Sequence, residues 1–309
     1  MPTDGYALAI HGGAGTLHRG DMTAEREAFY RVGLVHAIRA GRDVLAQGGS
    51  ALDAVTRAVC ALEDNPLFNA GRGAVFTRAG TQEMDAAMMD GRDRRAGAAA
   101  GIFGPRNPIL AARAVMESSP HVLLIGDGAV SFCREAGLEF AEAAYFFTES
   151  RWAALRATLA QEEAGLVDSD ESRRHGTVGA VARDCCGNLA AATSTGGMTN
   201  KRPGRVGDSP IIGAGTYAKN GVCAVSATGH GEYFIRAVAA HHVCAAVEYR
   251  GLTLEQAAHE LLHRILRELG GDGGLIAIDG VGRIVMDFST EGMFRGARDA
   301  AGRREIAIY

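Results

Sequence analysis

One boundary in the chain, between Gly176 and Thr177, restricts both its fold and its chemistry. Residues 161–174 before it are rich in Glu, Asp, Ser and Arg and poor in large apolar side chains. Residues 178–182 after it are small, apolar and partly β-branched, which predicts a buried strand. The simplest interpretation is that Thr177 only opens this strand, as threonine often does.

A second strand is expected to mirror the first. Residues 184–188, Asp-Cys-Cys-Gly-Asn, form a turn signal, and residues 189–195 after them again predict a strand. If the hairpin is symmetric about Cys186, Thr177 and Thr195 lie opposite each other with Cβ atoms roughly 5 Å apart. A bulge in the turn would shift this register. The symmetric hairpin therefore predicts two facing hydroxyl groups.

These hydroxyls acquire a chemical use if the chain is cut before Thr177. The Thr177 hydroxyl would then act as a nucleophile, and the freed α-amino group of the same residue would accept its proton. An α-amine has a pKa of about 8, which suits a base at neutral pH, whereas a peptide nitrogen cannot serve. The junction therefore raises the hypothesis of a threonine hydrolase that activates itself.

A third hydroxyl follows at Thr228. Residues 222–228 predict a strand, and Gly229-His230-Gly231 leads into a helix expected from about Glu232. Backbone N–H groups at such a junction can hold a developing oxyanion, so Thr228 and the Gly229 N–H are candidates for that role. The alternative is an ordinary tight turn.

The loop of residues 203–210 carries two opposite charges, Arg205 and Asp208, between glycines and prolines. An arginine suits the α-carboxylate of an amino acid, and an aspartate suits its α-ammonium group. The alternative is an ion pair within a surface loop, which is common and usually without function.

Taken in order, these motifs resemble those of the isoaspartyl peptidases, also called plant-type asparaginases, which are N-terminal-nucleophile (Ntn) hydrolases. The resemblance rests on residues 11–15, 65–71, 89–91, 176–179, 193–197, 204–210, 228–232 and 273–279. It implies an α+β fold, a four-layer αββα sandwich, formed by residues 1–309 as one domain. It also implies autocleavage into 1–176, which ends in a flexible linker of about residues 161–176, and 177–309.

The resemblance also implies a role for each site residue. Thr177 would be the nucleophile, released by cleavage of the Gly176–Thr177 bond, and Thr195 would orient and polarise it. Thr228 and Gly229 would stabilise the oxyanion. The substrate would be bound by Arg205, Asp208, Gly229 and Gly231. Asn69, in the N-terminal half, would be a supporting hydrogen-bonding residue.

Family members also hold a sodium ion through backbone carbonyls, and no cofactor is expected for catalysis. The carbonyls here would come from Leu62, Glu63, Asn65, Phe68, Ala70 and Arg72. The assembly implied by the resemblance is a heterotetramer of two α and two β chains.

The expected reaction is hydrolysis of the side-chain amide of L-asparagine and of the isopeptide bond in β-aspartyl dipeptides, through a β-aspartyl ester on Thr177. A glycosylasparaginase-like hydrolase is the nearest alternative, but those enzymes carry Asp before the nucleophile, where this chain has Gly176. A non-catalytic relative with the same fold is a further alternative.

A zinc peptidase is a second enzyme class to weigh, because residues 259–263 match the motif His-Glu-x-x-His. On a helical wheel, the apolar face comprises Leu254, Ala257, Ala258, Leu261, Leu262 and Ile265. His259, Glu260 and His263 fall on the other face, so a solvated helix surface is the favoured interpretation, although a distant acid such as Glu291 can be imagined as a third zinc ligand.

Bulk properties favour a metabolic enzyme with a small-molecule substrate. The net charge is −4, and no basic cluster with interleaved aromatics suggests nucleic-acid binding. We find no secretory signal and no apolar run long enough to span a membrane, so a cytoplasmic location is expected. The six cysteines show no C-x-x-C spacing and are expected to be reduced.

Elements expected from periodicity and turn signals are helices at about 24–47, 51–64, 150–159, 232–248 and 253–268 and one near Arg113. Expected strands are 6–10, 74–77, 82–89, 96–103, 121–126, 178–182, 189–195, 222–228, 274–279 and 283–287. Residues 11–15 are interpreted as a structural glycine turn beside the active site.

Overall fold

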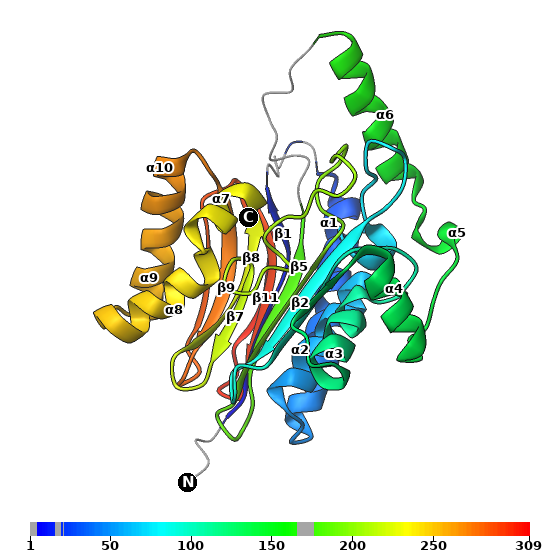
Figure 1. Ribbon diagram of the computed structural model, residues 1–309. Helices are drawn as coiled ribbons and strands as arrows, with labels where there is room; N and C mark the ends of the chain where they lie inside the picture. The colour runs from blue at the N-terminus through cyan, green and yellow to red at the C-terminus, as the bar shows by residue number, and fades with distance from the viewer. Residues whose placement is uncertain (1–4, 16–19, 21, 166–175) are drawn as a thin grey trace.

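Two β-sheets lie face to face between two layers of helices in the computed structural model, which describes residues 5–15, 20, 22–165 and 176–309 (Figure 1). Helices drawn in blue and green cover one sheet, and those in yellow and orange cover the other. The αββα sandwich of the Ntn-hydrolase type, expected from the sequence, is therefore confirmed.

The larger sheet has eight strands in the order β12-β11-β1-β5-β6-β2-β3-β4, antiparallel except for the β3–β4 pair. Its strands are β1 (Ala7–Gly15), β2 (Met84–Asp90), β3 (Ala96–Ile102), β4 (Leu123–Ile125), β5 (Val178–Arg183), β6 (Leu189–Thr195), β11 (Gly292–Asp299) and β12 (Arg304–Ala307). The smaller sheet, ordered β10-β9-β8-β7, comprises β7 (Thr216–Lys219), β8 (Cys223–Gly229), β9 (Gly273–Asp279) and β10 (Ile284–Phe288).

The helices that cover the larger sheet are α1 (Ala24–Ala46), α2 (Ala51–Glu63), α3 (Pro108–Ser118) and α4 (Gly126–Glu135). The smaller sheet is covered by α7 (Gly231–Ala237), α8 (Ala239–Arg250), α9 (Leu254–Glu260), the π-helical turn η4 (Leu261–Leu266) and α10 (Arg267–Leu269). The remaining elements are the 3₁₀ turn η2 (Gly71–Gly73), α5 (Ala143–Phe146) and α6 (Glu149–Glu163). Helix α6 projects from one end of the sandwich (Figure 1).

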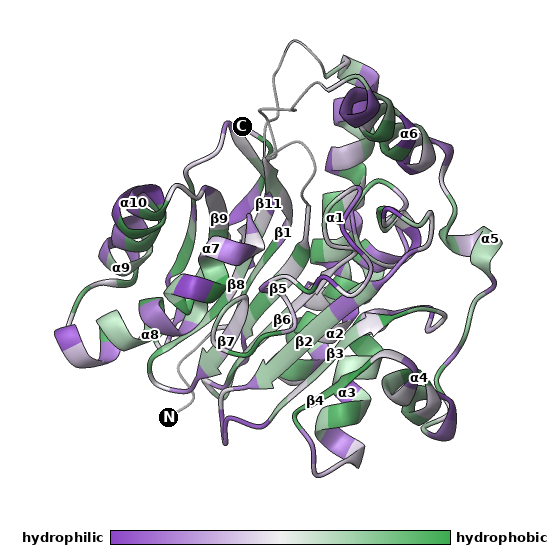
Figure 2. Cartoon of the chain, turned by 45° about the horizontal axis from the view of Figure 1, so that its top comes forward, coloured by the Kyte–Doolittle hydropathy of each residue, from purple (hydrophilic) through white to green (hydrophobic). Residues whose placement is uncertain are grey.

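The central strands of the larger sheet are buried on both faces, which explains their composition. Strands β3 and β6 read Ala-Gly-Ala-Ala-Ala-Gly-Ile and Leu-Ala-Ala-Ala-Thr-Ser-Thr, without the alternation of a half-exposed strand. Hydropathy colouring shows apolar residues gathered where helices meet sheets and polar ones on outer helix surfaces such as that of α6 (Figure 2). Small side chains let the layers approach closely, and threonine and serine hydroxyls stand among them.

The β5–β6 hairpin has the predicted register. Val178 pairs with Ser194 and Arg183 pairs with Leu189, so the hairpin is symmetric about Cys186. The turn is closed by a hydrogen bond from the Asp184 N–H to the Asn188 carbonyl. With no bulge in this hairpin, Thr177 and Thr195 lie on the same side of the two strands.

Other expectations need correction. Residues 74–77 form no strand beyond an isolated bridge at Thr77, and 11–15 continue β1 with a register shift rather than ending it. The helix expected at 232–248 is two helices, because Val238 adopts a left-handed conformation with φ 48° between them. Residues 161–163, expected in the linker, complete α6, and 166–175 lie outside the described residues.

The expectation of six reduced cysteines is wrong for two of them. Cys223 on β8 and Cys244 on α8 form a disulfide, with Cα atoms 5.8 Å apart. Helix α8 packs directly on β8, so the two residues, 21 apart in sequence, meet in the same buried layer. Spacing in the sequence could not reveal this contact.

Of the helices in the described part of the chain, none combines the length and apolarity that crossing a membrane requires.

Candidate active site

Thr177 is buried, with 5% of its surface exposed, at the start of β5. Its Oγ1 lies 3.2 Å from Thr195 Oγ1, the partner that the hairpin symmetry predicts. Thr195 Oγ1 also accepts a hydrogen bond of 3.0 Å from the Gly197 N–H. The two facing hydroxyls are therefore held in one geometry by the strand ladder and the following turn.

The carbonyl of Gly176, on the bond expected to be cut, faces two donors. Thr195 Oγ1 donates to this oxygen at 2.8 Å and Asn69 Nδ2 at 2.9 Å. Asn69 is itself fixed, because its Nδ2 also donates to the Gly197 carbonyl and its Oδ1 accepts from the Val75 N–H. Two fixed donors therefore polarise this carbonyl, an arrangement of the kind that stabilises a developing oxyanion.

The structure brings most of the predicted residues around one small cavity, about 220 Å³ including its open mouth. Its lining residues are Gly176, Thr177, Thr195, Gly197, Arg205, Gly207, Asp208, Ser209 and Gly229. Thr228 lies next to Gly229 on β8, fully buried, and its Oγ1 accepts a 3.2 Å hydrogen bond from the Ala14 N–H. Gly13 explains the close approach of β1, since a Cβ there would lie 3.3 Å from the Gly176 Cα.

Asp208 is buried in the cavity wall with an unsatisfied carboxylate oxygen, Oδ2. Burial raises the pKa of this carboxyl from 3.8 to about 7, although its own backbone N–H and Arg205 oppose the shift. A cationic ligand would restore the charged form. Gly231, expected to bind substrate, lies against Asp208, and a Cβ there would lie 2.9 Å from Asp208 Oδ1.

Arg205 does not pair with Asp208 as the loop alternative supposed. Its Nε and Nη2 donate to the two carboxylate oxygens of Glu232, at 2.9 and 2.8 Å. His230 Nε2 lies 3.2 Å from the same carboxylate. Glu232, which the sequence placed only as a helix start, therefore fixes the guanidinium at the mouth of the cavity.

His11 links the nucleophile to a buried network of hydroxyls that sequence reasoning missed. Its Nδ1 lies 3.1 Å from the Thr177 carbonyl, and its Nε2 lies 3.0 Å from Ser226 Oγ. Burial lowers the pKa of His11 to about 3, so the ring is neutral. A carbonyl can only accept, so Nδ1–H donates to it and Ser226 donates to Nε2.

The network continues between the two sheets. Ser226 Oγ and Thr193 Oγ1 are 2.7 Å apart, and Thr216 Oγ1 donates to Thr193 Oγ1 over the same distance. Thr216 Oγ1 also lies 3.2 Å from the carbonyl of Ser209, the neighbour of Asp208. In the sequence, the signal for this network was the set of polar residues spaced along Ala-rich strands.

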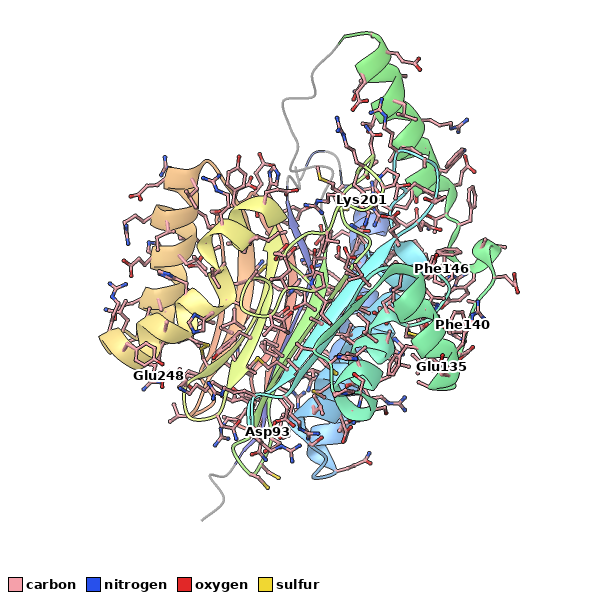
Figure 3. The ribbon with its side chains drawn as sticks, in the orientation of Figure 1. Asp93, Glu135, Phe140, Phe146, Lys201 and Glu248 are labelled. Atoms are coloured by element: carbon pink, nitrogen blue, oxygen red, sulfur yellow. A yellow bond between two sulfur atoms is a disulfide. The ribbon has the colours of Figure 1, made fainter. Side chains whose placement is uncertain are left out.

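Lys201 and Asp85 form a buried charge pair, with Nζ and Oδ2 3.9 Å apart and neither side chain exposed. Figure 3 labels Lys201 near the end of the sandwich from which α6 projects. Lys201 Nζ donates to the Glu83 carbonyl at 2.7 Å, and Asp85 pairs with Thr195 across β2 and β6. Burial lowers the pKa of Lys201 and raises that of Asp85. Asp85, within the otherwise apolar residues 84–89 of β2, was the missed signal.

In the loop proposed for sodium, two glycines lie close against backbone carbonyls. A Cβ on Gly73 would collide with the Phe68 carbonyl oxygen, and one on Gly71 would lie 2.7 Å from that of Glu63. Glycines thus leave a cradle lined by oxygens, the ligand type that hard cations prefer. In chemical type, these carbonyl donors therefore suit a hard cation such as sodium.

The His-Glu-x-x-His residues lie elsewhere, on the outer face of the helix layer over the smaller sheet. The predicted apolar face of this helix packs inward, with Leu254, Leu261 and Leu262 buried. Glu260 is held by Arg250 and Arg264. None of these residues lines the Thr177 cavity.

Comparisons with known proteins agree with this geometry. The family model described as Asparaginase matches residues 4–308. Isoaspartyl peptidases of Salmonella typhimurium and Escherichia coli are each 51% identical to this chain; the alignments cover 98% of this chain and 98% and 95% of those proteins. The isoaspartyl peptidase/L-asparaginase of Mus musculus is 43% identical, over 93% of this chain and 86% of its own length. The chain therefore belongs to the asparaginase family, as its motifs indicated.

Proposed function

We propose that this protein is a self-cleaving amidohydrolase that acts on L-asparagine and β-aspartyl dipeptides through Thr177. The relatives' names, isoaspartyl peptidase and isoaspartyl peptidase/L-asparaginase, support this assignment. The single observation that carries it is the polarised Gly176 carbonyl beside the Thr177 hydroxyl. This arrangement suits attack of that hydroxyl on its own preceding peptide bond.

The hydrogen-bond directions support such a cleavage. The Thr177 hydroxyl donates to Thr195, and Thr195 donates to the Gly176 oxygen, where negative charge grows as the Thr177 Oγ1–Gly176 carbon bond forms. The Gly176–Thr177 C–N bond then breaks, the Thr177 nitrogen gains a proton, and an ester remains. Water hydrolyses this ester and frees the α-amine and hydroxyl of Thr177.

The mature site repeats the chemistry on substrate. The Thr177 hydroxyl passes its proton to the α-amine and attacks the β-carbonyl, and the amine then protonates the departing ammonia or amino acid. The Gly229 N–H and the Thr228 hydroxyl stabilise the oxyanion, and water activated by the same amine releases aspartate. Asp208 accepts the substrate's ammonium group, and Arg205, oriented by Glu232, binds its carboxylate.

Three further assignments belong to this proposal. A sodium ion, held by the carbonyls of Leu62, Glu63, Asn65, Phe68, Ala70 and Arg72, supplies rigidity to the loop that carries Asn69. Cleaved chains 1–176 and 177–309 assemble as a heterotetramer of two α and two β chains. The enzyme is cytoplasmic.

A pair of variants tests the function. Thr177→Ala should stay a single chain and should hydrolyse neither L-asparagine nor a β-aspartyl dipeptide, because both nucleophile and amine are lost. Thr177→Ser keeps both groups and should cleave and turn over more slowly. Hydrolysis by the alanine variant at the wild-type rate would contradict the proposal.

A further inference from the structure

Three potential metal ligands meet on the outer surface, and none of them lines the Thr177 cavity. His259 and His263 lie one turn apart on the α9–η4 helix, and Asp287 comes from β10. One nitrogen or oxygen atom from each lies within 4.8 Å of those from the other two. The sequence suggested the histidines but not Asp287, for which Glu291 stood as the imagined ligand.

The spacing of these atoms matches a coordination shell. His263 Nε2 lies 3.0 Å from Asp287 Oδ1, and His259 Nδ1 lies 3.6 Å from Asp287 Oδ2. Zinc bonds to nitrogen and oxygen are about 2.0–2.2 Å long, so neighbouring ligands of a tetrahedral ion lie roughly 3.4 Å apart. The two observed separations, which involve the two different oxygens of Asp287, lie on either side of this value, and the imidazole rings stack with centroids 4.2 Å apart.

The surrounding structure fixes two of the three groups. Leu261 and Leu262 anchor the helix in the core, and the Phe288 N–H donates to Asp287 Oδ1 at 2.8 Å. The side chains of His263 and Asp287 are 33% and 26% exposed, whereas that of His259 is 69% exposed and can adjust its rotamer. The open side leaves room for water ligands.

Glu260 does not supply the base of a zinc peptidase. Its carboxylate is held by Arg250 at 2.7 Å and by Arg264 on the same helix. Two guanidinium groups neutralise the Glu260 carboxylate, so it does not act as a base. The two histidines can therefore bind a metal ion without forming a peptidase site. Imidazole nitrogens with one carboxylate favour transition-metal dications over calcium or magnesium.

We propose that His259, His263 and Asp287 form a binding site for a divalent transition-metal ion, such as Zn²⁺, with a structural role. The ion ties the α9–η4 helix to β10, the edge strand of the smaller sheet. Because the folded chain alone holds the three ligands together, binding raises the free energy of unfolding.

The test is calorimetric titration of metal-stripped full-length protein with Zn²⁺, together with thermal unfolding. The background carries Cys185→Ser and Cys186→Ser, because cysteine thiolates are zinc ligands and neither of these adjacent free thiols is buried. We expect one equivalent of Zn²⁺ to bind and the Tm to rise. His263→Ala and Asp287→Asn should each weaken binding by about tenfold or more, at least the cost of losing an outer-shell partner.

His121→Ala is the matched control, since it removes an exposed histidine outside the cluster and should bind Zn²⁺ as the background does. Circular dichroism checks folding, and His259→Ala, at the most exposed position, replaces any variant that fails to fold. Equal Zn²⁺ affinity in the Asp287→Asn and His121→Ala proteins would overturn the proposal, as would the absence of saturable binding in the background protein.

Discussion

Thr177 and His259 each stand in a motif with a catalytic precedent, yet their surroundings are opposite. Thr177 is buried, and the hydroxyl of Thr195 and the amide of Asn69 converge on the peptide bond before it. The side chain of His259 is 69% exposed, and its motif partner Glu260 is bound to two arginines.

The difference teaches that the supporting groups, more than the motif, decide what a site can do. Donors fixed in a buried site cost no reorganisation when charge develops, and burial strengthens their effect. An exposed pair of histidines lacks both advantages and retains only its capacity to bind an ion. Variants can separate these two situations.

The largest effect is expected from Thr195→Val, which keeps the shape of the side chain and removes the hydroxyl. Self-cleavage should slow by about 10²- to 10³-fold, the usual cost of losing one oxyanion donor. Denaturing gel electrophoresis over time after synthesis measures the rate. Cleavage at the wild-type rate would show that the Thr195 hydroxyl takes no part in self-cleavage.

Ser194→Ala is the matched control, one residue earlier on β6. Its hydroxyl points to the opposite face of the sheet and donates to Glu63 Oε1 at 2.6 Å. Self-cleavage should stay close to the wild-type rate in this variant, although its stability should fall.

Arg205→Ala should affect substrate binding and leave cleavage intact. Loss of a charged hydrogen-bonding partner should raise KM for L-asparagine by about 10- to 100-fold. Arg202→Ala removes an exposed arginine from the same loop and should leave KM unchanged. Steady-state kinetics decide the matter, and a normal KM in cleaved Arg205→Ala protein would show that another group binds the carboxylate.

Glu63 extends the contrast between buried and exposed groups to stability. Burial raises the pKa of Glu63 from 4.5 to about 8, so between these values the folded chain keeps a proton that the unfolded chain releases. The free energy of unfolding therefore falls as pH rises through this window, by at most about 1.4 kcal/mol per unit. Glu63→Gln, neutral throughout, should lose roughly 2 to 3 kcal/mol less between pH 5 and 7 in urea titrations.

Equal pH slopes in the two proteins would show that Glu63 is ionised when folded. The amide oxygen that Glu63→Gln introduces can still accept from Ser194 and from the Ile109 N–H, so the variant keeps both hydrogen bonds of the native side chain.

The sequence predicted the features that depend on residue order and on short-range contacts. Hairpin symmetry placed Thr177 opposite Thr195, and the turn signal at residues 184–188 placed the strands on either side of it. These features need only local pairing rules, so the chain order is enough to find them.

Contacts between distant strands were beyond that reasoning. The Lys201–Asp85 pair joins a loop to β2, and the hydrogen bond between Ser226 and His11 joins strands of the two sheets, which meet only after the sheets stack. The break at Val238 was likewise not predictable, since a β-branched residue rarely adopts φ 48°.

The smallest effect is expected from Glu260→Gln. If the histidine motif has no part in hydrolysis, kcat and KM for L-asparagine should each change by less than about twofold, as is usual for surface substitutions. A loss of activity as large as that of Thr177→Ala would reverse the comparison and restore the peptidase interpretation.

The most direct measurement is a denaturing mass spectrum of purified protein, taken on samples assayed for L-asparagine hydrolysis as self-cleavage proceeds. The account predicts two fragments, 1–176 and 177–309, with activity rising in proportion to the cleaved fraction. An intact chain of 309 residues that hydrolyses L-asparagine at the full rate would contradict it.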